Sequence, residues 1–257
     1  MDIYIPENVE KIIDKLEGSG FEAYIVGGCV RDSILGKEPK DYDITTSALP
    51  EQVKACLDGY SVIDTGIKHG TVTVIADDEY IEITTFRIDG NYSDHRRPDS
   101  VSFSENLLDD LSRRDFTINA MAYNRRTGVI DKFGGQKDLF RRIIKCVGEP
   151  AVRFNEDALR IMRALRFASE LNFTVDTITS AAIHDLRRLL GSVSVERISR
   201  ELNLLLTGAA PSDVLIEYGD VIATFIPELR PCIGFDQHSR YHVYDIWTHT
   251  AVAIEHS

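Results

Sequence analysis

The chain has 257 residues, 43% of them hydrophobic, and a formal net charge of −12. This length is enough for a sizeable core and more than one domain, and the lack of any run of about 18 apolar residues excludes an ordinary transmembrane helix. The four cysteines are far apart with no CxxC pair, and no signal peptide precedes the first strand. We therefore expect a cytoplasmic protein with reduced thiols and no zinc site.

The first 150 residues are predicted to form a mixed α/β head. A helix is expected over residues 7–19, where apolar residues recur at helical spacing. Strand-like runs follow at 24–26, 41–45, 60–64, 71–76 and 80–86, with a helix near 50–57 that begins at Pro50. The segment 89–106 is rich in Asp, Ser, Arg and Pro without periodicity, which predicts a mobile loop.

The pattern becomes helical after Pro150. Helical spacing covers 155–171, 176–190, 194–207 and 212–224, and no convincing strand remains. We interpret residues 1–150 as a head, 151–210 as a neck and 211–257 as the start of a helical body. The last residues begin a helix that has no end signal, so we expect a piece of a longer protein.

Basic charge is concentrated in residues 113–166. This segment holds ten Arg and three Lys against four Asp and two Glu, a net charge of +7 within an acidic chain. Arginine suits bidentate contacts with phosphates and bases, although a solvated helix face would give the same count. The overall negative charge therefore does not exclude a nucleic-acid partner.

A glycine turn and a pair of acids follow one another closely in the head. The strand at 24–26 runs into Gly27-Gly28, where backbone N–H groups can approach a phosphate, and Arg31 adds positive potential. Asp41 and Asp43 alternate on a strand and so point to one face. Neighbouring carboxylates repel each other unless a cation separates them, and such oxygen ligands suit Mg²⁺. Either element alone is often only a turn, but together they predict a metal and triphosphate site.

Three motifs in order identify a resemblance. They are GGCVRDSILG (27–36) followed by DYD (41–43), RRDFTIN (113–119) and EDALRIMRALRF (156–167). The chain from about residue 20 to 205 resembles the bacterial tRNA nucleotidyltransferase/poly(A) polymerase family. The resemblance implies an α+β protein, with a nucleotidyltransferase-type mixed-sheet head followed by an all-helical neck and the start of a helical body.

The resemblance also implies site residues. Asp41, Asp43 and Glu82 would be the catalytic residues and the ligands of two Mg²⁺ ions, which activate an RNA 3′-hydroxyl and stabilise the leaving pyrophosphate. Without the resemblance, Glu82 would be interpreted as an ordinary solvent-facing residue of a strand. The implied nucleotide-binding residues are Gly28, Arg31, Arg114, Asp157, Arg160, Arg163 and Arg166, with Gly27, Asp115 and Asn119 as further candidates.

The helix expected from about Asn155 would carry the base-selecting residues. Helical spacing puts Asp157, Arg160 and Arg163 on one face, opposite the apolar residues. A row of mutually paired charges is the alternative interpretation. The resemblance implies that Asp157 accepts from the exocyclic amine of a base while Arg160 donates to its ring acceptors. Such a pair would admit cytosine and adenine and reject uracil and guanine.

Three activities occur in this family: addition of CCA to tRNA, addition of CC or A alone, and poly(A) polymerisation. The segment 65–71, TGIKHGT, is typical of CCA-adding members and disfavours poly(A) polymerase, and the intact loop at 89–103 favours a complete enzyme over a CC-adding one. An A-adding enzyme stays open. The expected partners are tRNA, ATP and CTP, with no membrane and no protein partner.

The sequence also suggests two other interpretations, and neither is favoured. A noncatalytic RNA-binding relative is disfavoured because all three carboxylates are present. The segment 238–256 resembles the entry to an HD-type phosphohydrolase domain, but the His-Asp pair expected after it is absent.

Overall fold

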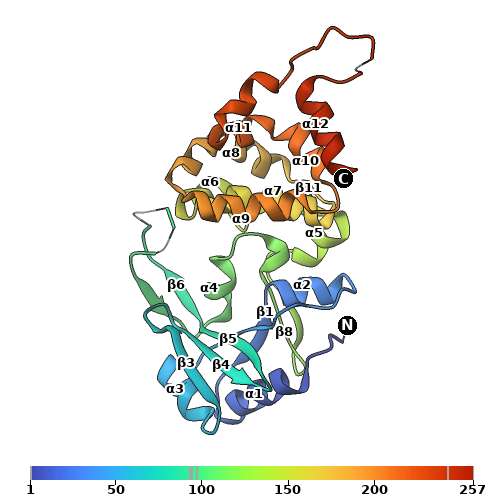
Figure 1. Cartoon of the computed structure of the whole chain (residues 1–257). Coiled ribbons are helices and arrows are strands. Elements are labelled where there is room, and N and C mark those ends of the chain that lie inside the picture. The colour runs from blue at the N-terminus through green and yellow to red at the C-terminus, as the bar shows by residue number, and fades with distance from the viewer. Residues whose placement is uncertain (1, 93–94, 97, 242, 257) are drawn as a thin grey trace. The chain divides into compact units, whose positions relative to one another are not determined.

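The computed structural model describes residues 2–92, 95–96, 98–241 and 243–256. The chain forms two compact units (Figure 1): Met1–Asn91 with Pro98–Leu139, and Tyr92–Arg97 with Phe140–Ser257. The units divide after Leu139, earlier than the boundary expected near residue 150. The division into a head at 1–150, a neck at 151–210 and a body at 211–257 stays a prediction. Each compact unit is described by itself.

A seven-stranded mixed sheet organises the first unit. Its strands in spatial order are β3 (Ser61–Gly66), β4 (Thr71–Ala76), β5 (Glu79–Thr85), β2 (Asp43–Thr46), β1 (Ala23–Val26), β8 (Met121–Asn124) and β9 (Gly128–Asp131). Only β2 and β5 pair in parallel among these neighbours in the described sheet, with Ile44 opposite Ile83. The residue before each member of that pair is acidic, so Asp43 and Glu82 lie at the same level of neighbouring strands.

The helices of the first unit are α1 (Glu7–Gly18), α2 (Gly28–Ile34), α3 (Pro50–Cys56), α4 (Leu107–Ser112) and α5 (Gly135–Arg141), with 3₁₀ turns η1 (Ile67–His69) and η2 (Thr117–Asn119). The helices and strands expected in residues 7–86 are therefore confirmed to within a few residues. All four residues of β1 are buried, as expected for a central strand covered on both faces. Tyr24 and Phe86 pack against Leu111 of α4 in a hydrophobic cluster that fixes α4 on the sheet.

The prediction of a mobile loop over 89–106 is wrong near both ends of this segment, where the chain forms strands. Strands β6 (Arg87–Asp89) and β7 (Val101–Phe103) pair antiparallel, and the Gly90 N–H donates to the Ser100 carbonyl. At residues 92–97 the chain belongs to the second unit, where the carbonyl of His95 accepts from the N–H of Ala158 at 3.1 Å. Ser93, Asp94 and Arg97 lie outside the described residues.

The second unit is mainly helical, as expected. It contains α6 (Pro150–Glu156), α7 (Leu159–Leu171), α8 (Thr177–Leu186), η3 (Arg187–Ser192), α9 (Val195–Leu206), α10 (Pro211–Glu217), α11 (Gly219–Phe225), η4 (Pro227–Cys232) and α12 (Ile246–Glu255). Two details differ from the expectation. A short strand, β11 (Thr174–Val175), pairs in parallel with β10 (Ile143–Ile144), and the helix expected over 212–224 divides at Tyr218.

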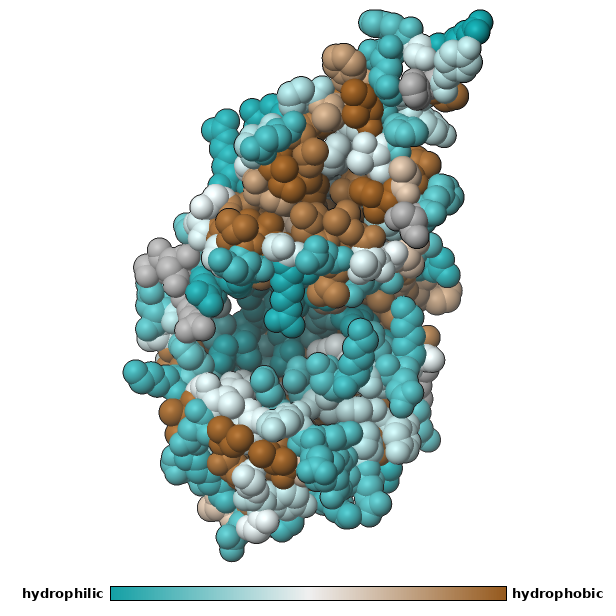
Figure 2. Space-filling model, viewed as in Figure 1, coloured by the Kyte–Doolittle hydropathy of each residue, from teal (hydrophilic) through white to brown (hydrophobic). Residues whose placement is uncertain are grey.

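The surface of the second unit carries apolar side chains. Figure 2 shows hydrophobic residues gathered on the viewed face of this unit, and its exposed apolar side chains include Ile216, Ile233 and Phe235. Contiguous apolar surface is typical of an interface with another element or molecule. Across the described part of the chain, no helix is both long and apolar enough to span a bilayer.

Gly135 offers a test of the packing in the first unit. A Cβ at this position would meet the Thr117 carbonyl oxygen and would lie 2.9 Å from Met121 Cγ. Gly135→Ala should therefore lower the free energy of unfolding by about 1–3 kcal/mol, the usual cost of overpacking. Urea unfolding followed by circular dichroism measures this change.

Gly18→Ala is the matched control, because a Cβ at the end of α1 meets no atom within 4 Å. It should be neutral or slightly stabilising, since alanine is the better helix former. Equal destabilisation by both substitutions would contradict the packing described at Gly135.

Candidate functional site

Three acidic residues gather at the end of the sheet where β2 begins. Asp43 is the first residue of β2 and lies beside Val26 of β1, and Asp41 precedes it in the connecting loop. Glu82 is exposed on β5 between the buried Ile81 and Ile83, as the alternating pattern predicted. The parallel pairing of β2 with β5 therefore brings residues from two distant parts of the sequence together.

The three carboxylates interact electrostatically. Asp43 is exposed at the surface, yet desolvation of its carboxyl by the surrounding protein and the nearby Asp41 raise its pKa to about 6, with a smaller contribution from Glu82 in the same direction. The Arg114 guanidinium lowers the pKa of the same carboxyl. Accumulated negative charge of this kind favours either a proton or a cation at the site.

The carboxylates are not arranged as a finished metal centre. Within the described ranges, no group of three or more His, Cys, Asp or Glu side chains is placed closely enough to hold an ion. The donor set nevertheless fits Mg²⁺, which prefers carboxylate oxygens and keeps several waters. The assignment of Asp41, Asp43 and Glu82 as ligands stays a prediction.

The glycine turn lies next to these acids. Gly27 has φ 82° and ψ −127°, and a Cβ there would lie 3.1 Å from Arg114 Nη1. Glycine is thus required both for the backbone conformation and for the close approach of the guanidinium. The Gly27 N–H donates to the Met121 carbonyl at 3.2 Å, so this N–H is already bonded within the fold, and contact of the Gly27-Gly28 turn with a phosphate stays a prediction. Gly28 is the first residue of α2.

Arg31 and the RRDFTIN segment meet in one hydrogen-bond network. Arg31 Nη1 donates to Asn119 Oδ1 at 2.7 Å, and Asn119 Nδ2 donates to Asp115 Oδ1 at 3.1 Å. Arg31 also makes a bidentate pair with Asp32, at 2.8 and 3.0 Å. The network brings three predicted residues together, but it shows that Arg31 is held by an acid that the sequence analysis missed.

Asp110 is a second acid that the sequence analysis missed. It is fully buried and accepts from both Arg113 and Arg114. The sequence could have indicated these ion pairs, because Asp110 precedes Arg113 by three residues and Arg114 by four, which is the spacing of neighbours on a helix.

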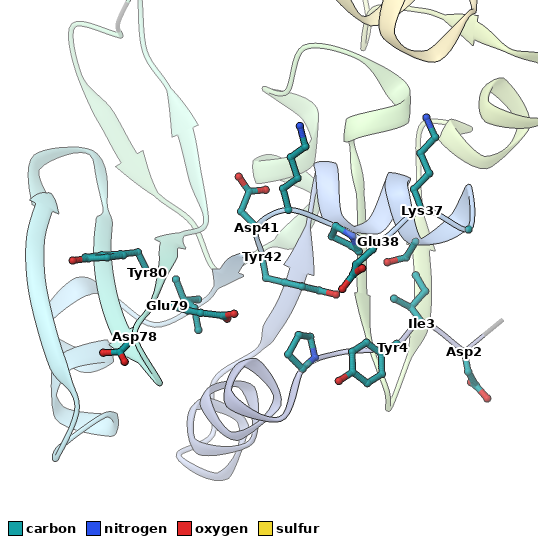
Figure 3. A pocket seen from close by; sticks show the side chains of 16 residues that line it. Asp2, Ile3, Tyr4, Lys37, Glu38, Asp41, Tyr42, Asp78, Glu79 and Tyr80 are labelled. Atoms are coloured by element: carbon teal, nitrogen blue, oxygen red, sulfur yellow. The ribbon is translucent and has the colours of Figure 1, made fainter. Parts of the chain in front are cut away.

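A cavity of about 570 Å³ adjoins Asp41. Its walls come from the segment before α1, the loop between α2 and β2, and the turn between β4 and β5. In Figure 3 the Tyr42 side chain extends toward Glu38, whereas Asp41 points away from it. Tyr42 and Asp41 thus leave the chain in different directions, but both precede β2, so the prediction that Asp41 lies on one strand with Asp43 is wrong. Burial raises the pKa of Tyr42 to about 12, and Cys29, Tyr4 and nearby acids make smaller contributions in the same direction.

The second unit corrects the expected helix for base selection. Asp157 has φ −133° and ψ 106°, an extended conformation between the end of α6 at Glu156 and the start of α7 at Leu159. The prediction that it shares a continuous helix with Arg160 is wrong. The Asp157 carboxylate instead accepts from the Leu159 N–H at 3.1 Å, across the break between the helices.

Asp157 and Arg160 have other partners. Arg197 Nη2 of α9 lies 3.1 Å from Asp157 Oδ2, and Arg160 Nη1 lies 2.6 Å from Glu156 Oε2. Asp157 and Arg160 are therefore paired with other residues of the protein and not with each other, which differs from the alternative of a mutually paired row.

Arg163 and Arg166 lie further along α7. The Arg163 guanidinium is 5.3 Å from the centre of the Phe167 ring and that of Arg166 is 3.9 Å from it. Arg166 Nε also lies 2.7 Å from Glu201 Oε2, which joins α7 to α9. Arg166 thus has a packing role in this structure, and nucleotide contacts by both arginines stay predictions.

Comparison with protein-family models shows two matches. Residues 23–145 match a model described as poly A polymerase head domain, and residues 172–232 match one described as a probable RNA and SrmB-binding site of polymerase A. Together these matches cover most of the sheet unit and a large part of the helical unit.

Relatives and solved structures agree with the family models. The chain is 51% identical to the CCA-adding enzyme of Lactobacillus delbrueckii subsp. bulgaricus over 220 residues, which are 86% of this chain and 54% of that protein. It resembles the crystal structure of the Bacillus stearothermophilus CCA-adding enzyme in complex with CTP, with a TM-score of 0.76, 45% identity and coverage of 83% and 51%. A Thermotoga maritima CCA-adding enzyme complexed with tRNA is 26% identical, with a TM-score of 0.70 and coverage of 88% and 54%.

The chain therefore belongs to the tRNA nucleotidyltransferase/poly(A) polymerase family, as the motifs predicted. It has the expected mixed-sheet head followed by helices. The chain spans about half the length of the relatives it matches.

The crowding of acids predicts a pH-dependent gain in stability on Asp43→Asn. The pKa of Asp43 is raised to about 6 in the folded chain, whereas an unfolded Asp titrates near 3.9. The folded state therefore favours protonated Asp43, and its stability falls as the pH rises from about 4 through 6. Solvent screening reduces the effect, since Asp43 is exposed; without metal, Asp43→Asn should therefore raise the unfolding midpoint slightly at pH 7.5 and less at pH 4. Calorimetry in buffer with EDTA measures both.

The exposed Asp58 supplies the control, because Asp58→Asn should shift the midpoint little at either pH. An equal effect of Asp43→Asn at both pH values would show that the three carboxylates are not coupled.

Proposed function

We propose that this chain carries the catalytic part of a metal-dependent enzyme that adds CCA to the 3′ end of tRNA, using CTP and ATP without a nucleic-acid template. The observation that carries the proposal is the group of Asp41, Asp43 and Glu82 beside the glycine turn, in a chain that resembles CCA-adding enzymes over most of its length. In this reaction the RNA 3′-hydroxyl attacks the α-phosphorus of the nucleotide, and pyrophosphate leaves.

The acidic residues would hold two Mg²⁺ ions. Bound magnesium would supply charge stabilisation for the attacking and leaving oxygens. The raised pKa of Asp43 supports this assignment, since a site that accumulates negative charge gains most from a cation.

Arg114 is the cation best placed to bind the triphosphate. It approaches Gly27 closely and lies near enough to Asp43 to lower the pKa of that carboxyl. Arg31 is less available, because Asp32 binds it in a bidentate pair. We therefore assign the main triphosphate contact to Arg114, with Arg31 and Asn119 supporting the turn.

Base selection by Asp157 and Arg160 requires an exchange of partners. Asp157 is paired with Arg197 and Arg160 with Glu156, and a base would replace these contacts. Such exchange is compatible with selectivity, because a wrong base would leave the released charges unpaired, which is costly where water is excluded.

An incorporation assay tests the proposed reaction. With Mg²⁺ and a tRNA that lacks its 3′ end, the chain should add C, C and then A from CTP and ATP. Asp43→Ala should reduce incorporation by roughly a thousandfold or more, since tenfold corresponds to about 1.4 kcal/mol and metal ligands supply several kcal/mol. Asp58→Ala, which removes an exposed acid of the same unit, should leave the rate unchanged.

Separate reactions with CTP alone, ATP alone and both distinguish the alternatives. Addition of A only to a tRNA ending in CC indicates an A-adding enzyme, and arrest after CC indicates a CC-adding one. Long A tracts on arbitrary RNA would indicate poly(A) polymerase and reject the proposal.

The base-selection assignment has its own test. Asn at position 157 offers both a donor and an acceptor, so Asp157→Asn should admit uracil. We expect the ratio of kcat/KM for CTP to that for UTP to fall by roughly ten- to a hundredfold, the scale of one charged hydrogen bond. Asp213→Asn changes an exposed acid of α10 in the same unit and should leave the ratio unchanged. An unaltered ratio in Asp157→Asn would remove Asp157 from base selection.

A further inference from the structure

Asp110 is the acid at the centre of a buried charge network in the first unit. Its side chain has no exposed surface, and it lies in the last turn of α4. Oδ1 accepts from Arg113 Nε at 3.0 Å and Nη2 at 2.6 Å, and Oδ2 accepts from Arg114 Nη2 at 3.0 Å. Burial alone would raise the pKa of this carboxyl, but Arg114 and Arg113 hold it below its ordinary value. Asp110 is therefore a buried anion that binds two guanidinium groups.

Arg114 is anchored from one side only within the described residues. Asp110 binds its Nη2, while its buried Nε has no hydrogen-bond partner there. Its Nη1 lies 3.1 Å from the position of a Cβ on Gly27. The anchored guanidinium thus lies against the glycine turn and close enough to Asp43 to lower the pKa of that carboxyl, with donor capacity left for a ligand. An arginine held in this way loses less conformational freedom when it binds an anion.

We propose that Asp110 is a positioning residue for nucleoside triphosphate: it holds the Arg114 guanidinium against the glycine turn, in the orientation that binds the phosphates. This inference rests on the proposed function, which places the triphosphate at that turn. Asp110 itself does not touch the nucleotide.

The other end of the network supplies a matched control. Arg113 Nη1 lies 3.8 Å from Asp89 Oδ2, and Asp89 Oδ1 accepts from Arg87 Nε at 2.9 Å. Asp89 has 6% of its side chain exposed. It therefore resembles Asp110 in burial and in binding two arginines, and among the described residues these are Arg87 and Arg113 and not Arg114.

The test is equilibrium binding of CTP and of CMP to the full chain and its variants. Asp110→Asn should weaken CTP binding by roughly tenfold, the scale of one charge-assisted hydrogen bond. CMP, which lacks the outer phosphates, should bind as before. Asp89→Asn should leave CTP affinity within about twofold, because the described ion pairs of Asp89 are with Arg87 and Arg113 and not with Arg114. Both variants lose a buried ion pair, so both should lower the midpoint of thermal unfolding.

A double-mutant cycle separates positioning from a general loss of charge. If Asp110 acts through Arg114, then CTP should bind the double variant Asp110→Asn/Arg114→Gln no more weakly than Arg114→Gln alone. If the Asn variant does not fold, Asp110→Glu replaces it in the binding measurements. This variant keeps the charge but displaces it by one methylene. It too should lose CTP affinity without losing CMP affinity.

Three results would overturn the inference. They are unchanged CTP affinity in a folded Asp110 variant, additive effects in the cycle, and failure of both Asp110 variants to fold, which would make the residue structural. Absence of CTP binding by the unsubstituted chain would instead count against the proposed function.

Discussion

The parallel pairing of β2 with β5 is the contact on which the site depends. Residues Asp43 and Glu82 are almost forty positions apart in the chain, and this pairing puts Asp43, at the start of β2, beside Glu82 in the middle of β5. The arrangement has an electrostatic cost, because burial and neighbouring acids raise the pKa of Asp43 to about 6. The sheet keeps the acids close through backbone hydrogen bonds, which do not depend on side-chain charge. A metal-binding function is a physical reason for the fold to tolerate that repulsion.

The cations around this acidic edge are themselves held by acids. Arg31 is bound by Asp32, while Arg113 and Arg114 are bound by Asp110. Long basic side chains have considerable rotamer freedom, and buried carboxylates remove much of it before a ligand arrives. The same pairs keep the buried guanidinium groups from being left without compensation. Two arginines of the basic segment detected in the sequence, Arg113 and Arg114, are thus bound by one specific acid.

The second unit shows the same principle at its candidate base-selecting residues. Asp157 and Arg160 each have an ion-pair partner on the protein, Arg197 and Glu156 respectively. A break between α6 and α7, stabilised by the Asp157 side chain and by the carbonyl of His95, sets the direction of Asp157. A helix-wheel description would have missed this direction, because the residue is not helical. Selection by these side chains would then be a competition between internal partners and an incoming base.

The sequence by itself determined the order and type of most elements of the head, since alternation at Ile81, Glu82 and Ile83 and the spacing in α1 are local properties. It also determined the family, because whole motifs are local strings. Tertiary structure decided what local spacing cannot express: the neighbours of Asp43, the use of the Gly27 N–H in the sheet, and the ion pairs of Asp157 and Arg114. It also decided that β6 and β7 pair where a loop was expected. Each of these depends on residues far apart in sequence, whose contacts follow from packing and from the pairing of buried charge rather than from periodicity.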